Sequence, residues 1–238
     1  MTHIKELLKR GLNMKIVCIS DTHNQHEKLT IPEGDVLIHA GDWTGTGTHK
    51  QIIKFIRWFA NQPHKHKILI AGNHEITLDL TFYQTNWTQF HSKYPIRAHE
   101  LKSYVLREEG IIYLENHEVV IDGVKFYGSP VSPEFNDWAF GVERGEEIRK
   151  VWSQIPEDTD VLITHGPPYG YGDKLENDDR VGCKDLLTKI KRIKPKVHIY
   201  GHIHNGYGTY DFNSTKLINA ASCNEHYQLV NPPIVCEV

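Results

Sequence analysis

The chain has 238 residues, of which 39% are hydrophobic and 24% are charged, and its formal net charge is −3. This composition is typical of a globular protein with a substantial core, and it excludes a strongly basic nucleic-acid-binding protein. The one basic stretch, residues 189–196, alternates with isoleucines like the outer face of a surface helix, so we expect no stable nucleic-acid partner.

Membrane and disulfide-rich classes are also disfavoured. No apolar run approaches the ~20 residues that a membrane helix needs, and the first residues lack a hydrophobic signal core. The four cysteines are far apart and form no Cys-x-x-Cys pair, so we expect a reducing, cytoplasmic location. We expect residues 1–13 to be an N-terminal extension, either a helix or an upstream alternative start, and residues 14–238 to form one domain. The oligomeric state is not predicted.

Five short apolar runs in the chain end in residue types that bind metal ions. Each run has four to six residues, many of them β-branched, and is too short for a helix, so we predict buried strands. The predicted strands cover residues 15–20, 35–40, 68–71, 160–164 and 197–200. The residues that follow these strands are Asp21 and His23, Asp42, Asn73 and His74, His165, and His202 and His204.

Helical spacing of apolar residues separates several of these strands. The predicted helices cover residues 50–61, 78–91, 146–154 and 184–194. Alternation of strands and helices predicts a largely parallel α/β core, with its site at the carboxyl ends of the strands. From residue 111 the chain changes to short strands with a hairpin turn at Asp122-Gly123, so we expect a second sheet with antiparallel pairing to begin there.

Position distinguishes four of the 16 histidines from the others. His23, His165, His202 and His204 each lie at the end of a predicted strand. We expect the histidines in polar surroundings to be surface residues: His3, His26, His49, His64, His66, His91 and His99. His39 and His198 lie inside strands and are expected in the core.

The predicted ligands are two aspartates, one asparagine and four histidines, with no thiolate. Alone, the Asp21-x-His23 pair is equally well explained as a turn. The whole set suits Mn, Fe, Zn or Ni rather than a structural zinc or a calcium site. Seven ligands exceed what one tetrahedral ion takes, but shared through Asp42 they suit two divalent ions ~3.5–4 Å apart. Such a pair activates water for in-line displacement at phosphorus. His74 is then free to contact a phosphate oxygen or protonate the leaving group, so we predict that Asp42 and His74 are catalytic.

Two loops rich in aromatic residues are predicted to contact a substrate. Residues 128–140 contain Trp138, and residues 166–174, which follow the proposed ligand His165, contain Tyr169 and Tyr171. Aromatic faces beside a phosphate site can stack a nucleobase. For residues 166–174 the alternative is an ordinary surface loop.

Five motifs, in this order, resemble those of the calcineurin-like metallophosphoesterases. They are Asp21-Thr-His23, Gly41-Asp42, Gly72-Asn-His-Glu75, His165-Gly166 and Gly201-His-Ile-His204. Closer still is the resemblance to the metallophosphoesterase-domain (MPPED) branch, near the class III cyclic-nucleotide phosphodiesterases, and it covers nearly all of the chain from Met14. The stretches that carry this resemblance are Ile70-Ala-Gly-Asn-His-Glu75, Gly128-Ser-Pro, Thr164-His-Gly-Pro-Pro168, Arg180-Val-Gly-Cys183, Gly201-His-Ile-His204 and Asn231-Pro-Pro233.

The resemblance implies a four-layer αββα sandwich, in which two mixed β-sheets are flanked by helices and a dimetal site lies at the carboxyl ends of the strands. It implies a phosphodiesterase that acts on a small phosphodiester, including cyclic nucleotides. Among the metals that suit the ligand types, we expect manganese. One ion would be held by Asp21, His23, Asp42 and His204, and the other by Asp42, Asn73, His165 and His202. His74 would be catalytic. Some members of the branch have a small residue where this chain has His202, so the imidazole favours a competent catalyst.

Three alternatives stay open at this point. A nucleotide-binding or partner-binding protein with a weakly active metal site is disfavoured by the complete ligand set. A metal-dependent amidohydrolase usually opens with a His-x-His pair and uses a barrel, which the Asp-x-His opening and the hairpins do not match. The third alternative is a protein phosphatase.

Overall fold

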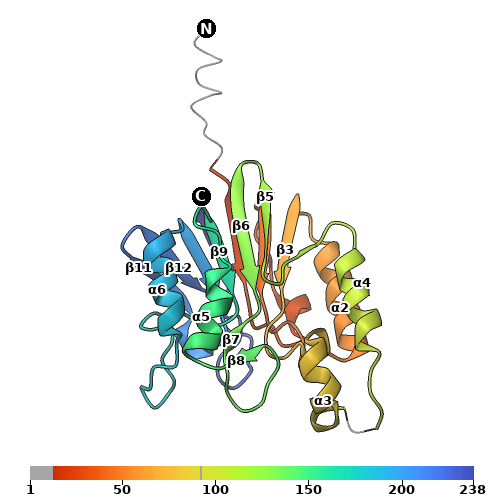
Figure 1. Ribbon diagram of the computed structural model, residues 1–238. Helices are drawn as coiled ribbons and strands as arrows, with labels where there is room; N and C mark the ends of the chain where they lie inside the picture. Colours follow the sequence, from red (N-terminus) through yellow and green to blue (C-terminus); the bar gives the residue numbers. More distant parts are fainter. Residues whose placement is uncertain (1–12, 92) are drawn as a thin grey trace.

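The computed structural model describes residues 13–91 and 93–238, which form two β-sheets packed face to face between two groups of helices (Figure 1). Helices α2 (His49–Ala60), α3 (Leu80–Phe90) and α4 (Ala98–Arg107) lie on one side, and α5 (Glu146–Ser153) and α6 (Lys184–Ile193) on the other. The predicted extension, residues 1–13, lies outside the described residues except for Asn13.

The first sheet has the strand order β13-β1-β2-β3-β4. Its strands are β1 (Lys15–Ile19), β2 (Val36–Ala40), β3 (His66–Ile70), β4 (Ile112–Tyr113) and β13 (Ile234–Glu237). The neighbours from β1 to β4 pair in parallel, and β13 is antiparallel to β1. The expectation that the second sheet begins at residue 111 is therefore wrong, because β4 pairs with β3 through Ile68 and Leu69.

The second sheet has the order β11-β12-β10-β9-β6-β5. Its strands are β5 (His117–Ile121), β6 (Val124–Ser129), β9 (Val161–Thr164), β10 (Val197–Tyr200), β11 (Gly208–Phe212) and β12 (Thr215–Asn219). The central pairs are parallel, and the two outer pairs are antiparallel hairpins. Asp122 and Gly123 both have positive φ in the first hairpin, as its predicted tight turn requires. Two further short strands, β7 (Ser132–Pro133) and β8 (Gly141–Val142), pair with each other.

Alternation along the strands divides the interior into three apolar layers. Ile16 and Cys18 of β1 pack between the two sheets, whereas Val17 and Ile19 pack against the helices on the outer side. A third cluster lies between the second sheet and helices α5 and α6, and includes Trp152. Successive side chains of a strand point to opposite faces, so a strand covered on both sides must be apolar throughout. The predicted four-layer α/β sandwich is confirmed.

Helix α4 lies in a stretch for which the sequence predicted no element. Its apolar positions Ala98, Leu101 and Val105 are spaced for one buried face. The residue before the helix, Arg97, makes no side-chain capping hydrogen bond, so the usual start signal is missing. Helix α2 shows the contrast, since Thr48 and Gln51 form a capping box at its start.

Burial corrects the expectation for three histidines. His26, His64 and His91 are buried, although the sequence predicted surface positions. His39 and His198 are fully buried, as expected, and each ring pairs with a threonine hydroxyl. The four cysteines are free and buried. Within residues 13–91 and 93–238, no helix combines the length and hydropathy that a membrane span requires.

Candidate metal centre

The predicted ligands come together because parallel strands of both sheets end at the same edge. Asp21, Asp42 and Asn73 follow β1, β2 and β3 of the first sheet, and His165 and His202 follow β9 and β10 of the second. Four of the candidate ligands adopt backbone conformations that are rare for residues other than glycine: φ is 51° at Asp21, 39° at His23, 55° at Asp42 and 68° at His202. Such conformations cost free energy and cluster at functional sites.

One group of ligands consists of Asp21, His23 and His204. Nε2 of His23 lies 3.2 Å from Nε2 of His204, which in turn lies 3.4 Å from Oδ1 of Asp21. The other ring nitrogen of His204 donates to the carbonyl of Asn224 at 2.8 Å, so its Nε2 carries the lone pair in the neutral ring. Three potential donor atoms of a metal site therefore face a common point.

The second group consists of Asp42, His165 and His202, joined by Asn73. Nε2 of His165 lies 3.2 Å from Oδ2 of Asp42 and 3.0 Å from Oδ1 of Asn73. Nδ1 of His165 donates to the carbonyl of Ala40 at 2.9 Å, which again leaves a lone pair on Nε2 of the neutral ring. Asp42 also belongs to a cluster with His23 on the other side, so its carboxylate lies between the two groups.

Nε2 of neutral His165, Oδ2 of Asp42 and Oδ1 of Asn73 are all acceptors, so a cation is the group that fits between them. Burial lowers the pKa of His165, but the charge and hydrogen bond of Asp42 outweigh burial and raise that pKa to about 9. By contrast, burial lowers the pKa of His23 to about 4 and that of His202 to about 3, which keeps both rings neutral and able to bind metal. The donor set fits two divalent ions.

Close packing around the ligands requires glycine, as Gly72 and Gly201 show. A Cβ atom at Gly201 would lie 1.9 Å from Oδ2 of Asp21, and one at Gly72 would lie 2.3 Å from Oδ1 of Asp42. These glycines explain why the Gly-Asn-His and Gly-His-Ile-His motifs begin as they do. They let the backbone after β3 and after β10 approach the two carboxylates.

Glu75, for which the sequence predicted no role, accepts hydrogen bonds from the loops after β2 and β3, which carry ligands. Its fully buried carboxylate accepts hydrogen bonds from the backbone N–H of Asp42 at 2.9 Å, of Gly72 at 2.7 Å and of Thr44 at 2.8 Å, and from the Thr44 hydroxyl at 2.8 Å. Burial and the charge of Asp42 raise the pKa of Glu75 to about 8, while these donors oppose the rise. A glutamate directly after the Asn-His pair was the available signal.

His74 is oriented toward the same point without being needed as a ligand. Its backbone N–H donates to Oδ1 of Asp42 at 2.8 Å, and its Nδ1 lies 2.6 Å from the carbonyl of Gly45. Its Nε2 therefore faces the site, 3.9 Å from Oδ2 of Asp42. This nitrogen is placed to exchange a hydrogen bond or a proton with a group bound above the ligands.

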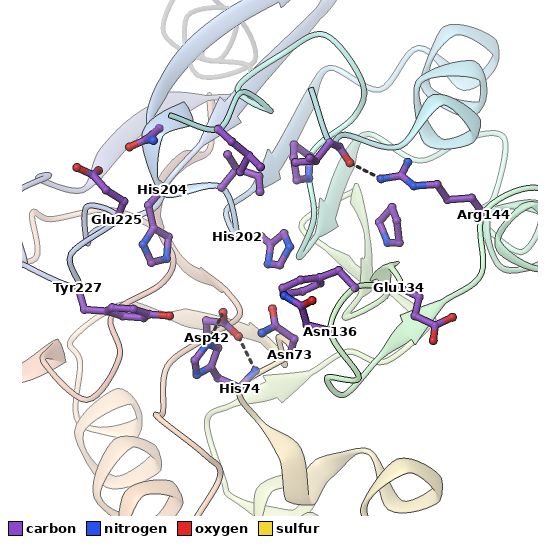
Figure 2. A pocket seen from close by; sticks show the side chains of 17 residues that line it. Asp42, Asn73, His74, Glu134, Asn136, Arg144, His202, His204, Glu225 and Tyr227 are labelled. Carbon is purple, nitrogen blue, oxygen red and sulfur yellow. Dashed lines mark hydrogen bonds and ion pairs between the residues drawn. The ribbon is translucent and has the colours of Figure 1, made fainter. Parts of the chain in front are cut away.

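A cavity of about 480 Å³ opens above these residues (Figure 2). Its floor includes Asp42, Asn73, His74, His202 and His204. Its walls are formed by Pro133, Glu134, Phe135, Asn136, Arg144, Pro167, Leu175, Val181, Ile203, Asn205, Glu225 and Tyr227. The guanidinium of Arg144 donates to the carbonyls of Val181 and Gly182, which ties the two loops on that side together.

The three aromatic residues predicted to bind substrate are not among the residues that line this cavity. The Trp138 ring lies behind His74, at 4.4 Å between ring centroids. The Tyr171 ring packs on Phe212 at 5.3 Å, and Lys184 lies over the ring of Tyr169. The aromatic residues that do line the cavity, Phe135 and Tyr227, are respectively in the predicted loop 128–140 and in a C-terminal loop.

Residues 14–206 match the family described as calcineurin-like phosphoesterase. The chain belongs to this family. It is 40% identical over 230 residues to the human metallophosphoesterase domain-containing protein 1, covering 94% of this chain and 71% of the human protein. It is 41% identical over 228 residues to a UPF0046 protein of Caenorhabditis elegans, covering 93% of this chain and 74% of that protein.

A comparison of structures gives the same fold. A crystal structure with 18% sequence identity superposes with a TM-score of 0.59 and covers 87% of this chain and 90% of the other. The chain is a metallophosphoesterase homologous to the MPPED proteins, and its buried histidine and aspartate clusters suit a metal centre.

Proposed function

We propose that this calcineurin-like phosphoesterase is a dinuclear-metal-dependent phosphodiesterase that hydrolyses a small phosphodiester. The observation that carries the proposal is the convergence of lone pairs on two points that share Asp42, at the floor of an open cavity. Binding alone would not require two adjacent cation positions beside a free histidine nitrogen. Hydrolysis at phosphorus uses both.

The residues divide into two ligand sets around the shared carboxylate. One ion would be held by Asp21, His23, Asp42 and His204, and the other by Asp42, Asn73, His165 and His202. Mixed imidazole and oxygen donors fit manganese, and also iron, zinc or nickel. When bound, the pair supplies Lewis acidity and an activated water for attack on phosphorus.

The protein's own contribution beyond the ligands is centred on His74. Its Nδ1 is committed to the carbonyl of Gly45, so its Nε2 is the atom that meets the substrate. A proton on this Nε2 can pass to the leaving oxygen when the bond to phosphorus breaks. Trp138 packs against the ring of His74, with 4.4 Å between the ring centroids. Geometry therefore supports general-acid catalysis by His74.

The walls of the cavity suggest the substrate class. Phe135 is 39% exposed and lies 5.0 Å from the ring of His202, and Leu175 and Tyr227 are also exposed at the cavity. An exposed aromatic face beside a phosphate site can stack a base, worth ~1–3 kcal/mol. We therefore propose a cyclic nucleotide as substrate, with its base against Phe135. Tyr169, Tyr171 and Trp138, which the sequence predicted for this role, are not among the residues that line the cavity.

A hydrolysis panel with manganese tests the proposal. It includes 2′,3′- and 3′,5′-cyclic nucleotides, a bis(nitrophenyl) phosphodiester and nitrophenyl phosphate, with metal content measured on the same samples. We expect diesters to be hydrolysed faster than the monoester, and Asp42→Asn to lower both activity and the affinity for both ions. The proposal fails if two ions bind and no phosphodiester is turned over, which would leave a binding protein with a weakly active site.

A further inference from the structure

The histidines around the metal centre differ in how their rings are held. Nδ1 of His165 pairs with the carbonyl of Ala40 and Nδ1 of His204 with that of Asn224. Such hydrogen bonds fix the orientation of a metal-binding imidazole. Nδ1 of His23 is buried and has no hydrogen-bond partner among the described residues. Packing must therefore hold the ring of His23.

Aromatic rings surround His23 on three sides. Its ring centroid lies 4.6 Å from that of His74, 5.1 Å from that of His204 and 4.8 Å from that of Tyr227. The contact with Tyr227 is edge to face, with an angle of 80° between the rings. Tyr227 also meets the His204 ring at 5.5 Å and 88°. Among these three neighbours, Tyr227 is neither a predicted ligand nor a predicted acid.

The position of Tyr227 is unusual for such a residue. Its φ is 56°, a left-handed conformation that is rare for a bulky side chain, and the residue is 52% exposed. Neither feature is expected of a tyrosine that only stabilises the fold. Figure 2 shows the ring extending from its loop across the edge of the site toward Asp42 and His74. Strain at an exposed aromatic points to a role at the site.

The loop that carries Tyr227 is built to keep it there. The side-chain carbonyl of Asn224 accepts hydrogen bonds from the backbone N–H groups of His226 and Gln228. Gln25, which follows the ligand loop of β1, donates to the carbonyl of Tyr227 at 2.7 Å. The backbone carbonyl of Asn224 holds the ring of His204. One loop therefore controls two ligands, His204 through a hydrogen bond and His23 through an aromatic ring.

We propose that Tyr227 is a positioning residue that orients the metal ligand His23 through ring packing, in place of the hydrogen bond that this imidazole lacks. The inference rests on the metal centre of the proposed function. It assigns the role to the ring and not to the hydroxyl, because the contacts with His23 and His204 are ring contacts. Loss of the Tyr227 ring leaves His23 free to turn. The affinity for the ion that His23 would hold then falls, while the affinity for the other ion is unchanged.

Calorimetric titration of metal-free protein with manganese tests this inference. We expect Tyr227→Ala to weaken one of two sites by ~10- to 100-fold, the range for loss of a group that orients a metal ligand. Tyr227→Phe keeps the ring and should bind both ions as the wild type does. Tyr94→Ala is the matched control, because this tyrosine is 73% exposed and does not line the cavity. Circular dichroism of each variant checks folding.

The outcomes separate the inference from the proposed function. Two ions bound equally by wild type and Tyr227→Ala would overturn the role of Tyr227 while leaving the metal centre intact. A loss of affinity in Tyr227→Phe as large as in Tyr227→Ala would assign the effect to the hydroxyl and overturn ring packing. Wild-type protein that binds no manganese would overturn both proposals. A role of Tyr227 only as a substrate wall would raise KM without moving the metal affinity.

Discussion

Replacing the buried Glu75 with glutamine should destabilise the protein and loosen the metal centre together. The carboxylate joins the loop after β2 to the loop after β3, since Asp42 and Gly72 both donate to Oε2. Oε1 accepts two further bonds, from the backbone and the hydroxyl of Thr44. Glutamine keeps one acceptor oxygen but places an NH₂ group, which can only donate, against the other pair of donors.

The expected loss follows from the count of these contacts. Two of four hydrogen bonds to a charged group are lost, and each such bond contributes ~1.5–3 kcal/mol. The neutral side chain also removes the cost of the buried charge, which the raised pKa of Glu75 records, and this offsets part of the loss. The free energy of unfolding should therefore fall by about 1–3 kcal/mol, the cost of buried donors left without an acceptor, against the ~5–15 kcal/mol that is typical of a folded protein. For a chain of this length the melting temperature should drop by about 2 °C or more.

Urea denaturation at pH 9 is the suitable assay, because a pKa of about 8 leaves Glu75 ionised there. Glu109→Gln is the control, since Glu109 is exposed, and it should change stability by no more than ~0.5 kcal/mol. Manganese titration of Glu75→Gln should show weaker binding, because Asp42 and Asn73 lie on the loops that Glu75 joins. A loss of stability below ~1 kcal/mol would refute the view that Glu75 accepts these bonds as a carboxylate.

Three further predictions concern histidines. His74→Ala should keep both manganese ions by elemental analysis but lower kcat by ~10²–10³, and an equal loss for nitrophenyl and alkyl diesters would exclude proton donation. His202→Gly should weaken one manganese site and His204→Gly the other, and unchanged titration of the first variant would remove His202 from the ligands. Burial lowers the pKa of His26 to about 4 from 6.5, so the folded chain binds fewer protons and loses stability as pH falls from 6.5 toward 4. In His26→Phe this slope, measured by urea denaturation, should be shallower by up to ~1.4 kcal/mol per pH unit, and identical slopes would contradict the assignment.

Some features were readable from the sequence because they depend on neighbours along the chain. Strand β1 is apolar on both faces, so the sequence alone showed a short apolar run that ends before Asp21. The hairpin at Asp122-Gly123 was visible because its turn needs positive φ at both residues. The burial of His26 was not visible, because its ring packs on Phe55 and Trp58 of α2, more than twenty residues away.

The aromatic residues at the site show most clearly where sequence reasoning ends. The sequence predicted that Tyr171 contacts the substrate because it follows His165 closely, whereas in the structure its ring packs on Phe212 and does not line the cavity. Tyr227 follows His204 by 23 residues, and only the path of its loop brings it against His23. Chain proximity predicts contact poorly in a loop, since each residue adds two free dihedral angles.

The sequence by itself therefore determined the strands that precede the ligands, the order of the motifs along the chain and the residue types that follow each strand. It did so because apolar periodicity and metal-binding residues are local properties that parallel strands carry to one edge of a sheet. The tertiary structure decided which side chains reach the cavity, that Glu75 joins two ligand loops, and that Tyr227 lies against His23. These contacts join segments from different strands and loops, and their distances depend on how the two sheets pack.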